Sequence, residues 1–415
     1  MSALLARSLR SLAIPNYRRY FVGQIVSLTG TWTEAIAETW LVFQLTHSGL
    51  ALGIAAALQW IPLLLAGAWG GLVADRLPRR RLLMVTQTLL ALPALALFAL
   101  VVTDAIELWM VYALLLARGV VGVVDNPARQ AFLVELVGPE HLLNAVGLTS
   151  AIVNASRTVG PALAGVLIAT VGIAPCFVIN AASFLALILA LHGMDAAALV
   201  PVPRAERAAG QVRSGLRYVR ATPQLWITLC LVAVCTTFAF NFQVLLPLLA
   251  TFSLHGGASS YATLATAMGL GAVGGAVSNG TRTHIRPTLL IGAVLVFGML
   301  SLVVSVAPSV ALAAAVLVPV GAAWVVFATG ALSALQLAVV PEMRGRVMAL
   351  FSIVAFGSMP IGAPLTGWIA NATGPRPALA LGGAAAILGA IAARIAFVRT
   401  GVPTRVAIGV GEARA

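Results

Sequence analysis

The sequence contains no lysine: all 25 of its basic residues are arginines, and only 9% of the 415 residues are charged. A nucleotide-binding loop of the G-x-x-x-x-G-K-S/T type uses a lysine to hold the phosphates, so the chain carries no ATP-driven motor of that kind. Soluble domains have about 25% charged residues. A mean hydropathy of +1.02 therefore excludes the water-soluble globular class.

Cysteine is also scarce. The three cysteines, Cys176, Cys230 and Cys235, fall inside apolar runs without the spacing of a metal or redox site, and we interpret them as small buried hydrophobic residues. The five histidines are scattered, and the sequence shows no grouping of nucleophile, base and oxyanion donors. We therefore expect no metal, no cofactor and no enzymatic activity.

Apolar runs long enough to cross a bilayer recur along the whole chain. About 20 apolar residues span the hydrocarbon core as a helix, and the alternation typical of a barrel is absent. The first run, near Tyr20, is too long for a signal peptide. We predict an all-α integral membrane protein with twelve transmembrane helices, over residues 20–43, 50–74, 82–103, 108–128, 143–170, 173–193, 225–250, 258–279, 287–306, 309–339, 345–370 and 377–398.

The arginines divide between alternate loops. One set of loops and termini holds nearly all of them, whereas the other set holds only Arg376. By the positive-inside rule, the N-terminus, the C-terminus and the 194–224 connection are expected in the cytoplasm, and an even helix count requires the same. The net charge of +13 thus indicates topology and not a nucleic-acid-binding face.

The chain repeats itself weakly across its longest connection. Residues 160–165, GPALAG, correspond to residues 362–367, GAPLTG, at an offset of 202, and residues 70–75 correspond to residues 274–279 at an offset of 204. We predict an N-terminal six-helix half (1–193), a cytoplasmic linker (194–224) and a C-terminal six-helix half (225–415) with a short tail. Two parallel halves with a central site indicate a secondary transporter.

Several motifs resemble those of one transporter family. Residues 71–80, GLVADRLPRR, resemble the G-x-x-x-D-R-x-x-R-R loop between helices 2 and 3 of the major facilitator superfamily. Residues 118–122, RGVVG, resemble the R-x-x-x-G motif of its proton-coupled drug antiporters, and residues 160–165 resemble a reduced G-P-x-x-G-G antiporter motif. Residues 126–132, NPARQAF, and 344–348, RGRVM, are similar to the branch that includes the enterobactin exporter and macrolide efflux proteins.

The resemblance implies a proton-coupled exporter in the bacterial inner membrane, working by alternating access on siderophores, antibiotics or other amphiphilic molecules. It implies small-molecule substrate, protons and membrane lipids as partners, without ATP or nucleic acid, and we expect a monomer. Ala164 and Asn279 depart from the family motifs. The alternative functions are a facilitator or proton symporter that imports a small metabolite, and a receptor or lipid-handling protein, which the lack of a large extramembrane domain disfavours.

Four charged residues fall near the middle of the predicted spans: Glu34, Glu38, Arg118 and Arg157. Placing a charge at the centre of a membrane helix costs about 2.5–3.5 kcal/mol on insertion scales. Each of the four is therefore expected to have an ion-pair partner or a functional role. Glu34 and Arg118 lie at nearly the same depth, about 21 Å up one helix and about 15 Å down the other. The resemblance places both helices on the central cavity, so we expect the two residues to be partners.

The roles of these residues have alternatives. Glu34 either exchanges protons in the cavity or forms a fixed ion pair with Arg118, and Glu38 is either a second proton site or a wetted residue at the cavity mouth. Arg157 either binds an anionic group of the substrate or bonds backbone carbonyls of the segment 160–165. Within that segment, Gly160 and Gly165 allow close contact between helices and Pro161 allows a bend. The segment is either a structural kink only or also a block to proton leak.

The motif residues Gly71, Asp75, Arg76, Arg79, Arg80 and Arg129 form a predicted cytoplasmic gate. Asp75 is expected to accept hydrogen bonds from a helix N-terminus or from Arg129, while the motif arginines also meet anionic lipid. Such ion pairs would hold the outward-facing state closed to the cytoplasm. The alternative is a solvated loop that sets topology, which accounts for the arginines but poorly for Asp75.

Aromatic and amide side chains in the second half suit an amphiphilic ligand. We predict Phe238, Asn241 and Gln243 of the seventh helix and Trp324 of the tenth as residues of the substrate cavity. The alternative is that these aromatic side chains face lipid or pack in the protein.

Overall fold

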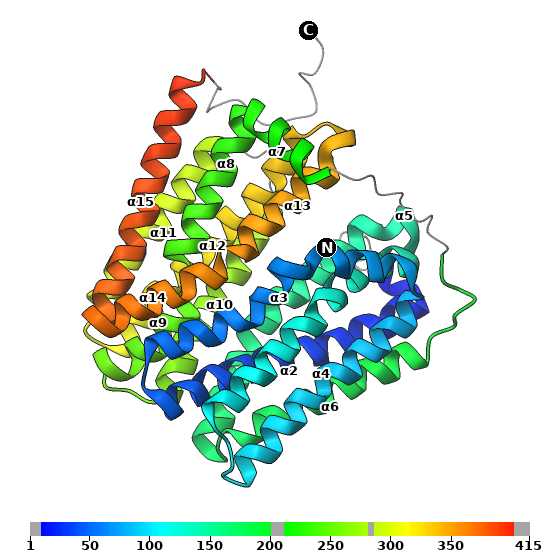
Figure 1. The fold of residues 1–415 in the computed structure, drawn as a ribbon, viewed down its shortest axis with the longest axis horizontal. Helices are drawn as coiled ribbons and strands as arrows, with labels where there is room; N and C mark the ends of the chain where they lie inside the picture. The colour runs from blue at the N-terminus through cyan, green and yellow to red at the C-terminus, as the bar shows by residue number, and fades with distance from the viewer. Residues whose placement is uncertain (1–9, 201–210, 281–285, 402–415) are drawn as a thin grey trace. The chain divides into compact units, whose positions relative to one another are not determined.

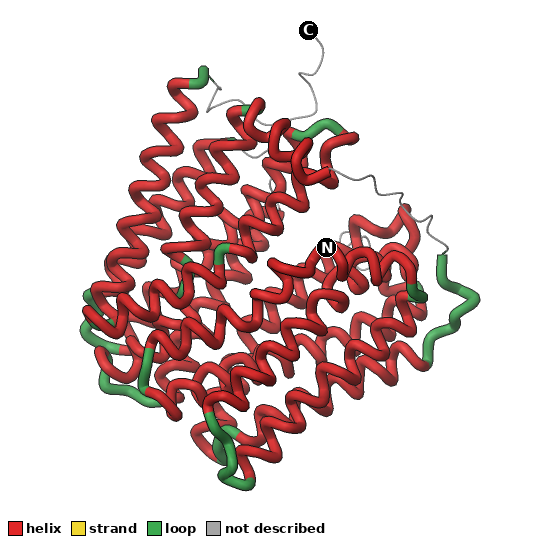
Figure 2. The backbone as a smooth tube through the Cα atoms, viewed as in Figure 1, coloured by secondary structure: helices red, strands yellow, loops and turns green. Residues whose placement is uncertain are grey.

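The computed structural model describes residues 10–200, 211–280 and 286–401, and within these ranges it is helical without a β-strand (Figures 1 and 2). The elements are η1 (Arg10–Ala13), α2 (Pro15–Thr46), α3 (Gly49–Arg76), α4 (Arg79–Val102), α5 (Leu108–Thr170), α6 (Ala174–His192), α7 (Gln211–Ala221), α8 (Pro223–Val234), η2 (Cys235–Ala239), α9 (Phe242–Leu248), η3 (Leu249–Ser253), α10 (Ala258–Gly280), α11 (Pro287–Ser305), α12 (Val310–Ala338), α13 (Pro341–Gly357), α14 (Met359–Thr373) and α15 (Pro375–Arg399).

Ten helices of the described residues are long and apolar enough to cross a membrane. One of them, α5, has 63 residues, or about 95 Å at 1.5 Å per residue, which is far longer than a bilayer core of about 30 Å. Gly138 divides it with φ 70 and ψ 174, a conformation that favours glycine. We call residues 108–137 the first arm and residues 139–170 the second arm of α5.

The first long helix, α2, is not among those ten because polar residues lower its hydropathy. With α2 added and the two arms of α5 counted separately, the described residues supply twelve crossings. The predicted all-α membrane fold with twelve helices is therefore confirmed. The predicted spans 108–128 and 143–170 both lie in α5, because helical residues continue up to the kink at Gly138 on both sides.

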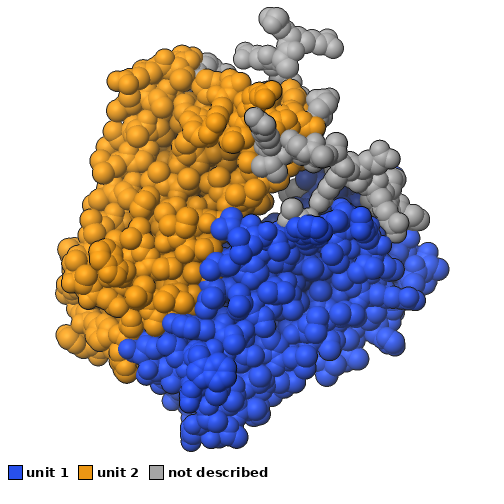
Figure 3. Space-filling view, viewed as in Figure 1, with its two compact units in different colours: residues 1–46, 58–206 blue, residues 47–57, 207–415 orange. Residues whose placement is uncertain are grey.

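The chain forms two compact units (Figure 3). Unit 1 comprises residues 1–46 and 58–206, and unit 2 comprises residues 47–57 and 207–415. The first turns of α3 thus group with unit 2. The boundaries at 193/194 and 224/225 remain a prediction about the functional halves.

In unit 1, α2 packs against both α5 and α6 through small residues. A Cβ atom added to Gly30 would lie 2.8 Å from Oδ1 of Asn180 on α6, and one added to Gly160 of the second arm would lie 3.0 Å from the backbone nitrogen of Thr33. Thr33 Oγ1 also donates a hydrogen bond to the Gly160 carbonyl at 3.2 Å. Glycine at these positions lets the helix backbones approach closely, as is common between membrane helices.

Unit 2 repeats this contact. A Cβ atom added to Gly362 of α14 would meet the backbone of Thr237 in η2, as one on Gly160 meets the backbone of Thr33 in unit 1. The glycines are 202 residues apart in the sequence and the threonines 204. The offsets that defined the sequence repeat therefore also relate equivalent packing contacts within the two units.

The seventh membrane helix is interrupted, and its prediction as one continuous helix over 225–250 is wrong in this respect. After α8 the chain forms the π-turn η2 and then leaves helical geometry at Phe240 and Asn241, with φ −99, ψ 59 and φ −114, ψ 37. Asn241 Nδ2 donates to the carbonyl of Thr237 at 2.8 Å. A side-chain amide thus satisfies a carbonyl next to the break, as non-helical backbone in a membrane requires.

Candidate functional site

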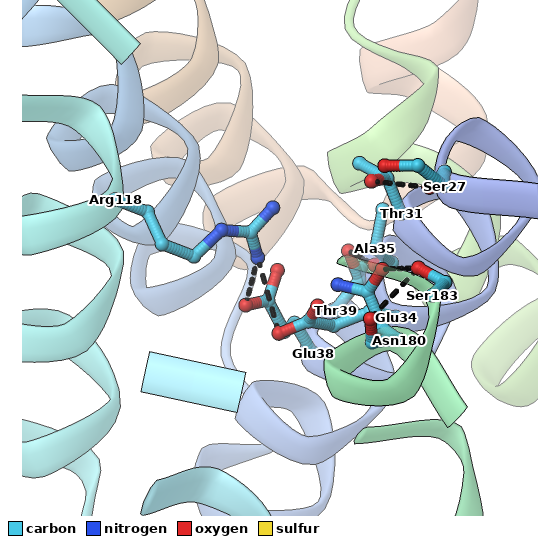
Figure 4. A network of polar contacts seen from close by, with 9 residues as sticks. All are labelled: Ser27, Thr31, Glu34, Ala35, Glu38, Thr39, Arg118, Asn180 and Ser183. Atoms are coloured by element: carbon cyan, nitrogen blue, oxygen red, sulfur yellow. Dashed lines mark hydrogen bonds and ion pairs between the residues drawn. The ribbon is translucent and has the colours of Figure 1, made fainter. Parts of the chain in front are cut away.

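Three of the four predicted intramembrane charges meet in unit 1 (Figure 4). Arg118 Nη1 binds Glu38 Oε1 directly and lies 3.5 Å from Glu34 Oε1. All three are buried: Glu34 is 0%, Glu38 4% and Arg118 7% exposed. Glu38, and not Glu34, is therefore the direct partner of Arg118. The alternative that Glu38 is a wetted residue at the cavity mouth is wrong, because the guanidinium and the surrounding helices enclose it.

Glu34 has the longer ion pair with Arg118 and no hydrogen bond. Neither of its oxygens accepts a hydrogen bond, although both are buried, and Asn180 Nδ2 is also buried without an acceptor. The other atom of that amide, Asn180 Oδ1, accepts from Ser183 Oγ at 3.0 Å (Figure 4). Buried polar atoms without partners are uncommon and cost free energy. This arrangement leaves Glu34 able to gain or lose a proton without breaking a hydrogen bond to the protein.

The two glutamates end a polar stripe along α2. Its members recur at alternating steps of four and three residues, which keeps them on one helix face. Apart from the half-buried Thr31, all are buried. The stripe consists of Tyr20, Gln24, Ser27, Thr31, Glu34 and Glu38.

The first arm of α5 carries a third buried carboxylate, Asp125, which was not predicted from the sequence. It is 5% exposed and accepts hydrogen bonds from Thr86 Oγ1 at 2.6 Å, Gln87 Nε2 at 2.7 Å and Arg129 Nε at 2.5 Å. Arg129 therefore pairs with Asp125, which corrects its expected pairing with Asp75. The available signal was the spacing of four residues between the acid and the arginine, which places them on one helix face.

The predicted cytoplasmic gate residues separate into different contacts. Arg79 is the central cation: its Nη2 lies 3.8 Å from Asp75 Oδ1, and its Nη1 binds Glu135 Oε1 at 2.6 Å. Glu135, on the first arm of α5, was not predicted. Gly71 is buried within α3, whereas Arg76 is exposed. The structure thus links the motif loop to α5 through Arg79.

Arg80 has a structural contact instead. Its Nε and Nη2 donate to the carbonyls of Leu191 and His192, each at 2.7 Å, and Arg19 Nη1 donates to the carbonyl of Gly193 at 2.7 Å. These carbonyls lie at the C-terminal end of α6, where a helix leaves its last carbonyls unpaired and favours a positive charge. Arg80 and Arg19 therefore cap α6.

Arg157, the fourth predicted charge, lies apart from this cluster. Its guanidinium carbon, Cζ, lies over the ring of Trp32, 5.0 Å from the ring centroid. The Gly160 carbonyl is bonded by Thr33, so the interpretation that Arg157 holds this segment through its carbonyls is replaced by a contact with an aromatic face. Pro161 is buried and Gly165 is half-buried within the same helix.

The predicted cavity residues of unit 2 do not form one group. Trp324 stacks on Phe240 with ring centroids 3.8 Å apart and an interplanar angle of 6°, and Phe297 and Phe327 pack around it. Asn241 is buried at the helix break, whereas Gln243 and Phe238 are exposed, Phe238 by 46%. Phe240, which was not among the predicted cavity residues, is the partner of Trp324.

The charged cluster has no charged counterpart in the repeat. At the offset of 204 established by Thr33 and Thr237, Glu34 corresponds to Phe238 and Glu38 to Phe242. At the offset of 202, Arg118 corresponds to Val320. Unit 1 therefore carries buried ionisable groups at positions where unit 2 carries aromatic and aliphatic side chains.

Residues 6–406 match the family model described as transmembrane secretion effector. The chain belongs to this family of the major facilitator superfamily. The family and the fold are those of membrane transporters, so the sequence-based recognition of a major facilitator transporter is confirmed.

The chain is similar to transporters whose names state what they carry. The chain is 32% identical to the staphyloferrin A transporter of Staphylococcus aureus over 41% of its own length and 44% of that protein. It is 27% identical to the enterobactin exporter of Citrobacter koseri over 69% of its length and 70% of that protein, and 28% identical to the multidrug efflux pump Tap of Mycolicibacterium fortuitum over 83% and 87%. The matched part thus spans less than half of the S. aureus transporter.

Solved structures support the fold alone. The nucleoside transporter NupG aligns with a TM-score of 0.73 at 14% identity, over 92% of this chain and 99% of that chain. A bacterial homologue of the human lysosomal transporter Spinster aligns with a TM-score of 0.66 at 15% identity, over 92% and 95%.

Proposed function

We propose that this transporter exports amphiphilic small molecules and that the proton gradient drives the export. The family description, secretion, and the relatives named as enterobactin exporter and multidrug efflux pump support the outward direction. The substrate class follows from the same relatives, which handle siderophores and drugs. Alternating access would present one binding site to each side of the membrane in turn.

One observation carries the proton coupling: a single guanidinium lies between two buried carboxyls, Glu34 and Glu38. If both were ionised, the group would hold one uncompensated negative charge away from water, which is expensive. One bound proton makes the group neutral. Because Glu38 has the direct ion pair and Glu34 has no hydrogen bond, we propose Glu34 as the carrier of that proton.

Proton release would then change what Arg118 holds. With Glu34 protonated, Arg118 pairs with Glu38 alone, as the geometry favours. With Glu34 ionised, the two carboxylates compete for one guanidinium, and the arrangement of α2 and the first arm of α5 that suits the neutral group is destabilised. If the protonated and ionised forms of Glu34 favour different arrangements of these helices, protonation shifts the equilibrium between the two cavity orientations.

The Arg79 contacts suit a gate in this scheme. Arg79 joins Asp75 of the motif loop to Glu135 of α5, and both acids are only partly buried, so water can replace these ion pairs at modest cost. We propose that they form in one orientation of the cavity and break in the other. Exposed Phe238 supplies an aromatic surface for the apolar part of the substrate.

We further propose the bacterial inner membrane as its location, a monomeric state, and N- and C-termini in the cytoplasm, on the basis of the arginine distribution.

The first experiment identifies the substrate by comparing the metabolites in culture medium from cells with and without the gene. A compound that depends on the gene is then offered to everted membrane vesicles energised by an imposed pH gradient. We expect uphill accumulation that a protonophore abolishes and that ATP alone does not restore in vesicles lacking ATP synthase. Accumulation that persists after the pH gradient is collapsed contradicts proton drive. A compound that is less abundant in the medium of cells with the gene than in the medium of cells without it contradicts export.

A further inference from the structure

The second arm of α5 contains a cation without a counter-ion. Arg157 forms no ion pair with any carboxylate of the described residues, whereas Arg79, Arg118 and Arg129 each do. Its Nε is buried without a hydrogen-bond partner. The contact that positions it is the cation–π contact of its guanidinium with the Trp32 ring. A charge in a membrane helix without a protein partner marks a functional site.

Glu34 does not compensate this charge, because α2 separates them. Successive residues of an α-helix are rotated by about 100°, so Trp32 and Glu34, two residues apart, point to nearly opposite sides. Trp32 and Thr33 face the second arm of α5, as the Gly160 contact shows. Glu34 faces Arg118 of the first arm. The positive charge on the Trp32 side of α2 is therefore left for another anion.

The surroundings of Arg157 are polar and accessible. Ser150, Asn154 and Arg157 recur at steps of four and three residues and so share one helix face. Ser150 is exposed, and Asn154 and Arg157 are half-buried. The hydroxyl of Ser150 and the amide of Asn154 donate to carbonyls of their own helix, at 2.9 and 2.8 Å, and not to neighbouring helices. An open polar face of this kind in a membrane helix lines a water-filled passage and not lipid.

We propose that Arg157 and Trp32 bind the anionic group, a carboxylate or phenolate, of an amphiphilic exported molecule. The contact with the Trp32 ring positions the guanidinium, and its N–H groups then supply two parallel hydrogen bonds to an oxyanion. The indole offers the adjoining apolar part of the molecule a flat surface. This inference rests on the proposed function and specifies that the exported molecule carries a negative charge.

An anionic lipid headgroup has the same oxyanion chemistry and is the competing occupant. Binding is therefore measured on the full chain in nanodiscs of phosphatidylcholine and, separately, of phosphatidylcholine with phosphatidylglycerol. The probes are 1-naphthoate and 1-naphthamide, which share one apolar ring system and differ in charge. Equilibrium binding is measured with no pH gradient, so the outcome does not depend on proton coupling.

We expect the wild-type protein to bind 1-naphthoate at least about tenfold more tightly than 1-naphthamide, as a single charge-assisted contact of about 1.4 kcal/mol provides. Arg157→Gln should remove this preference, and Arg157→Lys should retain part of it, because lysine keeps the charge without the planar fork. Arg394→Gln, which changes an exposed arginine near the end of α15, is the matched control and should bind both probes as the wild type does.

Equal affinity of the wild type for the two probes, or no binding of 1-naphthoate, overturns the proposal without any variant, so a misfolded Arg157→Gln protein does not leave it undecided. An unchanged preference in Arg157→Gln also overturns it. Loss of 1-naphthoate binding only when phosphatidylglycerol is present assigns the site to lipid and overturns the substrate role. A protein that keeps the preference but shows no proton-driven accumulation contradicts only the proposed function.

Discussion

Arg118 binds Glu38 directly and holds Glu34 3.5 Å away, although the two glutamates lie one turn apart on the same face of α2. The two carboxyls are therefore unequal. Glu38 compensates the guanidinium, and Glu34 is buried beside them without a hydrogen bond. From this inequality we expect that replacing Glu34 changes transport and that replacing Glu38 changes stability.

Glu34→Gln should abolish accumulation driven by a pH gradient while downhill exchange of substrate continues, because glutamine fills the same space but cannot carry a proton. Glu38→Gln should reduce accumulation less completely. Both are measured in proteoliposomes with the substrate found in the medium. Glu107→Gln, which alters an exposed acid before α5, is the control and should accumulate normally. Wild-type accumulation by Glu34→Gln would assign proton coupling to another residue.

Glu38→Gln should lower the thermal unfolding midpoint of the purified protein more than Glu34→Gln does. Removing the direct partner of a buried guanidinium leaves an uncompensated charge, and breaking such a pair costs about 3–5 kcal/mol. Glu34→Gln removes no hydrogen bond and should shift the midpoint little. Equal shifts would show that Arg118 is shared evenly by the two carboxyls.

Asp75→Asn should slow transport several-fold while equilibrium substrate binding stays nearly intact, because Asp75 lies in the motif at the end of α3 and contacts Arg79. Glu135→Gln should have the same effect, since Glu135 makes the shorter contact with that arginine, at 2.6 Å. Transport rate and binding are measured on the same preparations. Weakened binding with an unchanged transport rate would place these acids in the substrate site and not in the gate.

Gly160→Ala should destabilise the protein by about 1–3 kcal/mol, because the added methyl group overlaps Trp32 and the α2 backbone. Gly147→Ala is the matched control on the same arm of α5. No neighbouring atom lies within 4 Å of its added Cβ, and alanine in a helix is favoured over glycine by about 0.5–1 kcal/mol. Thermal unfolding in detergent compares the two. A stable Gly160→Ala protein would contradict the close contact of α2 with the second arm.

Reporter fusions after Arg220 and after Arg399 should both report the cytoplasm, because the arginine-rich loops and termini are expected on that side. A fusion within the loop that follows α4, at Asp104, should report the opposite side. A periplasmic signal from either of the first two fusions contradicts the topology.

The sequence by itself determined the class, the helix number and the family of this protein. Apolar runs of bilayer length leave few structures open, because every backbone group in lipid must be bonded within a helix or a closed barrel. The repeat at offsets of 202 and 204 and the loop motif at 71–80 then specified the major facilitator fold, which the family match confirmed. Depth along a helix also brought Glu34 and Arg118 to one level, since the rise per residue is constant.

Which side chain contacts which was decided by tertiary structure. Glu34 and Glu38 lie on the same face of α2, one helical turn apart. Depths estimated by counting residues are uncertain by a similar distance, so they do not show which of the two is the partner of Arg118. Arg129 and Asp125 were both visible in the sequence, but the choice of Asp125 over Asp75 depends on Thr86 and Gln87 of α4, which complete that site.

The break in the seventh helix and the isolation of Arg157 also belong to the tertiary structure. Residues 223–253 form one stretch of high mean hydropathy, 2.0. Hydropathy does not show that Gly362 of another helix contacts the backbone of Thr237, or that the Asn241 side chain replaces a helical hydrogen bond. Arg157 and Glu34 are both predicted near the middle of their spans, yet α2 separates the two, because residues two apart in a helix point to nearly opposite sides. The position of a charged residue along its helix predicts its depth in the membrane, whereas the packing of the helices decides which neighbour its side chain faces.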